Sequence, residues 1–295
     1  MSLSALVANF FIMNELTVTI VGVGLISGSF ALGLRDKGFA KHIIGVSRTE
    51  ASGKRAVELG IVDEVLPLVD AIKKSDFIYI AIPVDATIPV LQTILDNITD
   101  KQFVADAGST KFAMCKAVEN HPMRHRFVAT HPMWGTEYSG PEAAVRDAFK
   151  GRACVICEKD KSDKDIVDTI ETIYKTLGMN MIYMDADAHD MHAAYISHIS
   201  HITSFALANT VLQKEKEENT IFELAGGGFE STVRLAKSSP AMWAPIFMQN
   251  RDNVLDVLNE HITQLLKFKV CLEKENFAYL EELMVNANKI KRILK

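Results

Sequence analysis

The 295-residue sequence predicts an α/β fold with a mostly parallel sheet, followed by an all-α C-terminal part. From residue 17 to residue 184, short β-branched runs alternate with amphipathic stretches, a rhythm typical of βαβ units. After Asp185 the strand patterns stop and helical patterns take over. The length also exceeds the usual span of one hydrophobic core. We therefore expect two domains, at residues 1–186 and 187–295.

The expected elements follow from these patterns in chain order. Strands are expected at 17–21, 42–46, 77–81, 103–106, 126–130, 153–157 and 181–184, and helices at 27–37, 50–59, 85–97 and 163–177. The second part is expected to form helices at 187–214, 240–275 and 277–294, with residues 225–229 as a flexible glycine turn. Apolar stripes along these helices predict a dimerisation surface as well as a wall for a substrate.

Composition and charge narrow the function classes. The chain is 48% apolar and 23% charged, which is typical of a folded domain. A net charge of -5 gives no basic patch for a phosphate backbone, so we expect no nucleic-acid partner. No segment reaches the roughly 18 apolar residues of a membrane span. The apolar opening at residues 3–13 lacks the features of a signal peptide, and we interpret it as an upstream start or an added segment.

The four cysteines are too few and too scattered for a disulfide framework, which favours a reducing cytoplasm. They are Cys115, Cys154, Cys157 and Cys271. Cys154 and Cys157 form a CxxC, a spacing that also occurs in redox and zinc sites. Because they lie on an expected strand, alternation directs them to opposite faces, and core packing is the favoured interpretation.

A glycine-rich turn joins the first strand to the first helix. It has the sequence Gly22-Val-Gly24-Leu-Ile-Ser27-Gly28, in which Ser27 takes the place of a third glycine. Gly22 permits a tight turn, Gly24 permits close approach of a pyrophosphate, and the helix N-terminus supplies free N–H groups. Two glycines alone are a weak signal, but the strand–turn–helix context predicts a Rossmann domain. The expected cofactor contacts here are Gly22, Gly24, Leu25 and Ile26.

The end of the second strand bears on the choice of cofactor. An acidic residue there would bind the ribose hydroxyls of NAD, whereas this chain has Ser47-Arg48. A hydroxyl followed by a guanidinium suits a 2′-phosphate, so NADP is favoured over NAD. The alternative is that Arg48 stacks on adenine and NAD is bound. Pro83, after the strand at 77–81, is a further expected contact.

Two polar clusters follow strands, where parallel sheets bind their ligands. One is Asp106-Ala-Gly-Ser109-Thr-Lys111, and the other begins at His131 and continues through Thr136 and Glu137. An imidazole at the end of a strand could take a proton at neutral pH. The alternative for one isolated histidine is a hydrogen bond to a loop carbonyl.

Further histidines lie on the long helix expected after residue 187. His198 and His201 are three residues apart and share a helix face, as do His189 and His192. No third-ligand pattern such as HExxH accompanies them, so we expect no metal site.

Arg234 and Trp243 complete the candidates. Arg234 comes just past the glycine turn, where we expect a helix to begin, and its guanidinium could bind a substrate carboxylate bidentately. The alternative is an exposed salt bridge. Trp243 lies near the start of the next helix, and a tryptophan there is more typical of a core or an interface.

Taken together, these motifs resemble the prephenate/arogenate dehydrogenase family of tyrosine biosynthesis. The resemblance runs through residues 22–29, 106–111, 131–137, 197–201 and 234–243, in the family's order. Each motif is ordinary alone, whereas five in order are specific. The resemblance implies a Rossmann domain with a helical dimerisation domain, in a cytoplasmic homodimer. It also implies oxidative decarboxylation of prephenate or arogenate with hydride transfer to NAD(P), giving 4-hydroxyphenylpyruvate or tyrosine.

The resemblance also implies roles for individual residues. His131 matches the histidine that accepts a proton or hydrogen bond from the ring hydroxyl, and Ser109 matches a serine that contacts that hydroxyl, the histidine and the cofactor. Arg234 matches the arginine that holds a substrate carboxylate. The pocket is expected to include His198 and His201, with Thr136, Ser197 and Trp243 as further substrate contacts.

The sequence departs from the family pattern at several places. Ser27 and the missing ribose acid resemble the NADP-using, arogenate-type members. Ser231 stands where some relatives carry an acid that pairs with the residue matching Glu137, which puts gating by that ion pair in doubt. We expect no regulatory domain beyond about residue 275, so feedback by tyrosine would act at the active site. Prephenate and arogenate are not distinguished by these motifs.

Two competing hypotheses remain. A β-hydroxyacid or 6-phosphogluconate-like dehydrogenase would share the architecture, but it uses a lysine on the first long helix of its second domain, and residues 187–209 contain none. A non-catalytic dinucleotide-sensing dimer would be expected to lose His131, Ser109 or Arg234, and all three are present.

Overall fold

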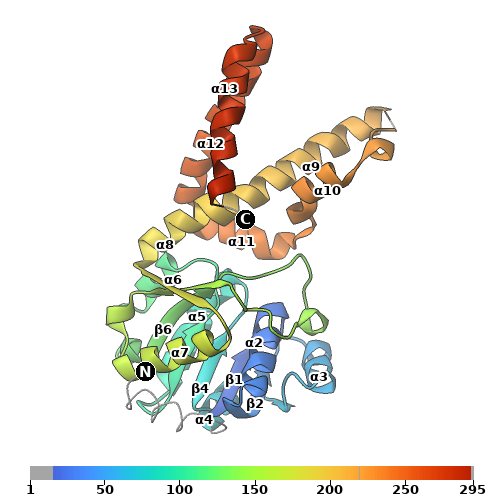
Figure 1. The fold of residues 1–295 in the computed structure, drawn as a ribbon. Coiled ribbons are helices and arrows are strands. Elements are labelled where there is room, and N and C mark those ends of the chain that lie inside the picture. The colour runs from blue at the N-terminus through green and yellow to red at the C-terminus, as the bar shows by residue number, and fades with distance from the viewer. Residues whose placement is uncertain (1–15, 219, 294–295) are drawn as a thin grey trace.

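The computed structural model describes residues 16–218 and 220–293, so the apolar opening at 3–13 lies outside the described residues. An eight-stranded sheet with helices on both faces forms the N-terminal part (Figure 1). The strands are β1 Leu16–Val21, β2 Ala40–Val46, β3 Glu64–Val65, β4 Phe77–Ile80, β5 Phe103–Asp106, β6 Phe127–Pro132, β7 Ala153–Cys157 and β8 Asn180–Met184. Its helices are α2 Leu25–Asp36, α3 Glu50–Glu58, α4 Leu68–Lys74, α5 Val84–Asn97, α6 Phe112–Ala117 and α7 Lys164–Thr176.

The sheet has the strand order β3-β2-β1-β4-β5-β6-β7-β8. All neighbouring pairs are parallel except β6 and β7, which confirms the mostly parallel sheet. The first six strands follow the order typical of Rossmann domains, in which the connection reverses direction between β1 and β4. Ligands bind outside the carboxyl ends of the strands at such a switch point.

The predicted strands and helices of this part agree with the structure to within two residues at each end. One strand and two α-helices were missed, β3, α4 and α6, of 2, 7 and 6 residues, as were the 3-10 helices Arg124–Arg126, Pro141–Ala143 and Lys159–Lys161. Segments this short do not complete enough of a helical or strand period to be detected. Cys154 and Cys157 are buried on opposite faces of the sheet, which confirms that they pack in the core.

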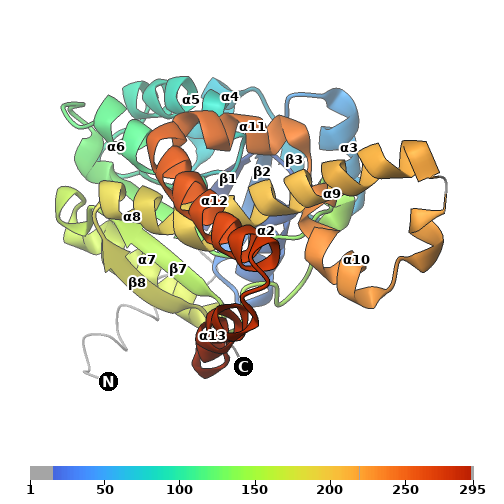
Figure 2. The same ribbon diagram turned by 90° about the horizontal axis from the view of Figure 1, so that it is seen from above.

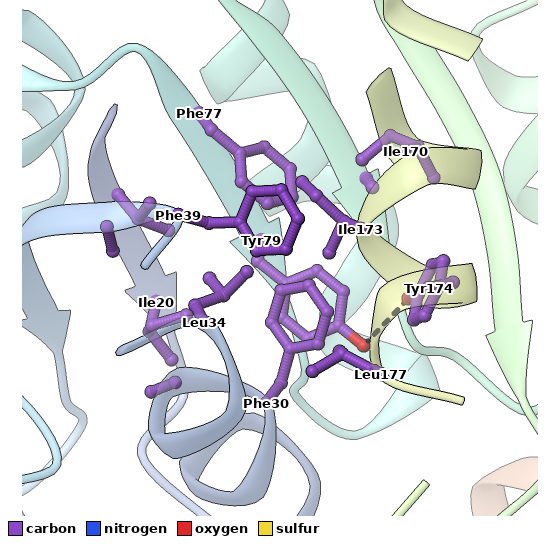
Figure 3. Packing of buried hydrophobic residues seen from close by; sticks show 14 of the residues in the cluster. Ile20, Phe30, Leu34, Phe39, Phe77, Tyr79, Ile170, Ile173, Tyr174 and Leu177 are labelled. Carbon is purple, nitrogen blue, oxygen red and sulfur yellow. Dashed lines mark hydrogen bonds between the residues drawn. The ribbon is translucent and has the colours of Figure 1, made fainter. Parts of the chain in front are cut away.

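An aromatic cluster fills the core between the sheet and the helices α2 and α7 (Figure 3). Phe30 of α2 stacks on Tyr79 of β4, with ring centroids 4.0 Å apart, and Phe77 lies edge-on to Phe30. The hydroxyl groups of Tyr79 and Tyr174 are hydrogen-bonded at 3.1 Å, which satisfies two polar groups in a dry core. All four residues of β4 are buried because helices cover both faces of the sheet.

The C-terminal part is helical, as predicted. Its elements are α8 Ala186–Ala193, a π-helical turn Ala194–His198, α9 Ile199–Glu218, α10 Gly227–Val233, α11 Pro240–Gln249, α12 Arg251–Glu273 and α13 Phe277–Ala287. In Figure 1, α8 and α11 lie next to the α/β part, whereas α12 and α13 project away from it. Seen from above in Figure 2, α8 and α9 follow one another across the molecule. No helix in the described part of the chain is long and apolar enough to cross a membrane.

Three predictions for this part were wrong. The helix predicted at 240–275 is interrupted at Asn250, which separates α11 from α12. Gly227 and Gly228 start α10 and do not form a flexible turn. The last helix ends at Ala287, and a 3-10 turn, Asn288–Arg292, follows it.

Candidate active site

The turn between β1 and α2 contains two glycines with different surroundings. Gly22 has φ +89°, and a Cβ there would lie 2.6 Å from the carbonyl oxygen of Ala81, so the fold itself requires glycine. Gly24 has φ -106°, a value that any residue adopts, and no atom lies within 4 Å of its would-be Cβ. The open space beside Gly24 therefore suits the close approach of a bound group.

Ser27 fixes this turn from within. Its hydroxyl donates to the carbonyl oxygen of Gly22 and accepts the N–H of Gly24 at 2.9 Å. The first helical hydrogen bond runs from Gly28 N to Gly24 O, which leaves the N–H groups of Leu25 and Ile26 ahead of it and free to bind an anion. The turn thus fits the pyrophosphate of a dinucleotide.

Gly28 allows close packing between α2 and the β6–β7 loop, whereas the third glycine of the usual motif allows close packing between helix and strand. Its would-be Cβ lies 2.8 Å from Cβ of Ala144, so glycine lets the loop between β6 and β7 lie directly on α2. Ser29 of the same helix accepts the N–H of Val145 at 2.9 Å. This contact holds the β6–β7 loop beside the glycine turn.

Ser47 and Arg48 follow β2, the strand that pairs with β1. The Ser47 hydroxyl donates to the carbonyl of Thr49 at 2.9 Å, and the Thr49 side chain caps α3 by accepting the N–H of Ser52. Arg48 is exposed and forms no ion pair within the described residues. Pro83 precedes the first turn of α5, at the end of the neighbouring strand β4.

The loop after β5 is anchored by a fully buried ion pair between Asp106 and Lys111. Asp106 also accepts the N–H groups of Gly108 at 2.7 Å and Thr130 at 3.0 Å. Burial raises the pKa of Asp106, and the positive charge of Lys111 acts in the opposite direction. These contacts fix the loop and leave Ser109 half-buried between its anchored neighbours.

His131 is the second-to-last residue of β6, and its side chain begins a buried series of hydrogen-bonded side chains. Its Nδ1 lies 2.8 Å from Nε2 of His189, and Nδ1 of His189 lies 2.8 Å from Oδ1 of Asp190. Burial lowers the pKa of His131 well below 6.5, and positive charge on His189, Lys111 and His198 would lower it further. His131 is therefore neutral at neutral pH and able to accept a proton.

The π-helical turn and α11 bring further side chains together. Nδ1 of His198 accepts a hydrogen bond from Nδ2 of Asn250 at 3.1 Å, and burial lowers the pKa of His198 to about 4. The ring of His201 stacks on Trp243 at 3.4 Å, and burial lowers its pKa as well. Trp243 packs against Val84, next to Pro83, so α11 reaches the loop at the end of β4. Ser197 is half-buried in the same turn.

Arg234 does not start an α-helix of its own. It follows α10 and starts a 3-10 turn that ends at Lys237. Its Nη1 lies 3.3 Å from Oε2 of Glu137, in the β6–β7 loop that also contains Thr136. Arg234 is exposed, and its positive charge contributes to the low pKa of His201. The arginine therefore faces both this loop and the histidines.

Most predicted site residues thus meet at one end of the sheet. Gly22, Pro83 and Ser109 follow β1, β4 and β5, and His131 lies near the end of the adjacent strand β6, so His131 lies about 14 Å from the glycine turn at normal strand spacing. His189 and His192 lie on α8, where His189 is buried and His192 is exposed. Among the described residues, no group of three or more His, Cys, Asp or Glu side chains is placed to hold a metal ion.

His189, Asp190, Gln249 and Asn250 were missed as site residues. Gln249 accepts from the hydroxyl of Thr110 at 2.8 Å and donates to the carbonyl of Val84 at 2.8 Å, so it joins two loops of the sheet to α11. Of these four, only His189 and Asp190 are sequence neighbours whose side chains bond to each other, so only this pair could have been recognised from local sequence. The other partners are far apart in the chain.

A Rossmann sheet whose site residues at the carboxyl ends of the strands contact histidines and an arginine of a helical domain defines a two-domain dinucleotide-dependent dehydrogenase. Family models described as the nucleotide-binding domain and the dimerization domain of prephenate dehydrogenase match residues 30–183 and 185–286. The chain belongs to the prephenate dehydrogenase family. The generic β-hydroxyacid alternative is not favoured.

Individual relatives agree with this assignment. Prephenate dehydrogenase of Bacillus subtilis is 30% identical over 90% of this chain and 72% of that protein. Cyclohexadienyl dehydrogenase of Zymomonas mobilis is 26% identical over 94% of this chain and 96% of that protein. The crystal structure of Aquifex aeolicus prephenate dehydrogenase with hydroxyphenyl propionate and NAD+ has a TM-score of 0.86 at 32% identity, covering 95% of this chain and 98% of that one.

Proposed function

We propose that this chain catalyses the oxidative decarboxylation of prephenate or arogenate, giving 4-hydroxyphenylpyruvate or tyrosine in tyrosine biosynthesis. The observation that carries the proposal is the buried, neutral His131 at the carboxyl end of the dinucleotide-binding sheet, together with His201 and Arg234 of the helical domain. The names of the B. subtilis and Z. mobilis relatives support it.

The residues divide the chemistry between them. Nε2 of His131 accepts the proton of the ring hydroxyl, since its other nitrogen is occupied by His189. Ser109 orients that hydroxyl. A bound nicotinamide would accept the hydride, and loss of carbon dioxide makes the ring aromatic. Base and hydride acceptor must act on the same carbinol, which requires both at one end of the sheet.

The carboxylated side of the substrate is assigned to the helical domain. Arg234 pairs with a substrate carboxylate, because its guanidinium is exposed and bonded only to Glu137 among the described residues. The remaining pocket residues are Thr136, Ser197, His198, His201 and Trp243. The Trp243 indole N–H is buried without a partner in the described part of the chain, so it is available to a bound molecule.

NADP is the favoured cofactor. Gly22, Gly24, Leu25 and Ile26 would hold the pyrophosphate, and Pro83 and Ser109 would border the nicotinamide. At the adenosine end, Arg48 has no competing carboxylate partner within the described residues, and Ser47 stands directly after β2 in place of an acid that would bind the ribose hydroxyls. NAD remains the alternative, with Arg48 stacked on adenine, and the A. aeolicus relative was crystallised with NAD+.

We also propose that the domains divide after residue 186, because the last strand ends at Met184 and only helices follow in the described chain. The protein is proposed to act as a homodimer in the cytoplasm, and the match to a dimerization domain supports the dimer.

The test is a spectrophotometric assay that crosses prephenate and arogenate with NAD and NADP at equal enzyme concentration. We expect reduced nicotinamide to form with at least one substrate, and faster with NADP. Failure with both substrates would contradict the proposed reaction, and faster turnover with NAD would overturn only the cofactor assignment.

The role of His131 is tested by His131→Ala. Loss of a general base should lower kcat on the order of 10²–10⁴-fold, with dinucleotide affinity little changed. Near-normal turnover in this variant would refute the role.

A further inference from the structure

Asp190 accepts three hydrogen bonds in a buried position. They come from Lys111 N at 2.7 Å, Phe112 N at 3.0 Å and Nδ1 of His189 at 2.8 Å. Two backbone donors at fixed positions favour the ionised carboxylate, which accepts hydrogen bonds and donates none. Nδ1 of His189 must therefore carry the hydrogen of this contact.

The position of the hydrogen on His189 determines the tautomer of His131. A neutral imidazole protonated on Nδ1 has its lone pair on Nε2, so Nε2 of His189 accepts. Its partner at 2.8 Å is Nδ1 of His131, which must donate. The lone pair of His131 then lies on Nε2, the nitrogen that is left for the substrate.

We propose that His189 and Asp190 are positioning residues that hold His131 in its Nδ1–H tautomer and take up the charge of the proton that it receives. The proposal rests on the proposed function for the identity of the proton donor. The substrate O–H bond breaks and its proton bonds to Nε2 of His131. The Nδ1 proton of His131 moves to Nε2 of His189, and the resulting imidazolium donates to the Asp190 carboxylate.

The other groups around His131 do not stabilise a positive charge on its ring. Lys111 and Asp106 lie on the β5 side as an ion pair, the apolar Val155 lies across on β7, and His198 lies on the helical domain. Burial and the neighbouring positive groups oppose a cation on His131. Asp190 is the carboxylate that reaches the histidine pair by hydrogen bonds, so it stabilises the proton once it is transferred.

The kinetic test compares Asp190→Asn and His189→Gln with two variants on exposed positions of the same helix, Asp187→Asn and His192→Gln. Asn at 190 keeps an oxygen for a backbone N–H but removes the charge. Gln at 189 keeps an acceptor for His131 but ends proton transfer. We expect kcat to fall on the order of 10²-fold in both, with KM for the dinucleotide unchanged and the two exposed variants near wild type.

The pH profile separates a relay from a structural role. Activity requires neutral His131, so kcat rises with pH through the pKa of the coupled histidine pair. Removing the negative charge of Asp190 destabilises the protonated pair and lowers that pKa. The acid limb of Asp190→Asn should therefore shift to lower pH while its plateau falls. A lower plateau with an unmoved limb would overturn the proposal.

A substrate-independent measurement keeps the two proposals distinguishable. In ¹⁵N-histidine-labelled wild-type protein, NMR shifts report which nitrogen of each ring carries hydrogen, with assignment by single histidine variants. We expect His131 and His189 both as Nδ1–H tautomers. An Nε2–H tautomer for His131 overturns the relay even if the enzyme is active. Absent turnover with both tautomers as expected would reject the proposed reaction and leave the tautomer assignment standing.

Discussion

Gly22 and Gly24 lie two residues apart in the glycine turn, but the space around their Cα atoms differs. The backbone of the protein itself demands Gly22, where a side chain would collide with Ala81. Nothing in the described residues crowds the space beside Gly24. Because no contact within the described chain requires glycine at position 24, we attribute this glycine to the close approach of a bound ligand. The pyrophosphate of a dinucleotide fits this position.

This difference yields a paired prediction. Gly22→Ala should lower the free energy of unfolding by at least roughly 1–3 kcal/mol, because it forces a positive φ and a backbone clash. Gly24→Ala should cost less than about 1 kcal/mol, since Gly24 is the helix N-cap and its Cβ has room, but should weaken dinucleotide binding. Urea unfolding and a dinucleotide titration measure the two effects. Equal stability losses, or unchanged affinity in Gly24→Ala, would contradict this interpretation.

Arg234 provides a second prediction at this scale. Arg234→Ala should raise KM for the carboxylated substrate about tenfold or more and leave KM for the dinucleotide unchanged, because a charged hydrogen bond is lost. Glu137→Gln is the matched variant, since it breaks the same ion pair without removing the guanidinium. We expect it not to raise the substrate KM. Equal increases for substrate and cofactor in Arg234→Ala would argue against the carboxylate contact.

Local sequence was informative wherever a residue's surroundings are set by its own strand or turn. Gly22, Ser109 and His131 follow strands with clear patterns, and they lie at the predicted edge of the sheet. His189 was not assigned because its partner is 58 residues away and no periodicity connects them. Long-range hydrogen bonds of this kind are determined by packing, which a single sequence does not display.

At the scale of elements, the break between α11 and α12 at Asn250 is also determined by long-range contacts that the sequence does not reveal. Apolar periodicity continues from 240 to 275, so the pattern predicts one helix. The structure interrupts it because the Asn250 side chain is buried and donates to the carbonyl of Asp190 at 2.7 Å and to His198. The π-helical turn at 194–198 contains His198, the partner of Asn250, and the sequence pattern did not predict this turn either. Tertiary contacts determine both irregularities.

Gln249, at the end of α11, should be sensitive to substitution for this reason. Gln249→Ala leaves the hydroxyl of Thr110 and the carbonyl of Val84 without their partner, and should destabilise the protein by about 1–3 kcal/mol. Gln264→Ala is the control, because the side chain of Gln264 bonds only to Glu260 and Lys267 of its own helix α12. Denaturant unfolding of both variants measures the difference. A similar loss in the two would show that the interdomain bonds contribute little.

At the scale of the whole molecule, the projecting helices expose many apolar side chains. On α12 these include Leu255, Ile262, Leu265, Leu266, Val270 and Leu272, and on α13 Phe277, Tyr279, Met284 and Val285. Exposed apolar area of this extent marks an association surface, in agreement with the match to a dimerization domain.

We therefore expect a substitution on this surface to shift the oligomeric state. Leu265→Asp should convert a dimer to a monomer in light scattering, because it would bury a charge at the interface. Val57→Asp, on an exposed part of α3, should leave the dimer intact. An unchanged dimer in Leu265→Asp would exclude this part of α12 from the interface.

The aromatic residues of the molecule are unevenly distributed, with an optical consequence. The sheet core contains phenylalanines and tyrosines, and Trp134 packs against it, whereas Trp243, the chain's other tryptophan, lies in the helical part. Trp134 lies edge-on to Phe149, and Trp243 stacks on the imidazole of His201. One of the two tryptophans therefore emits beside a proposed substrate contact. Quenching on titration with a dinucleotide or a substrate analogue would report occupancy directly, without a label.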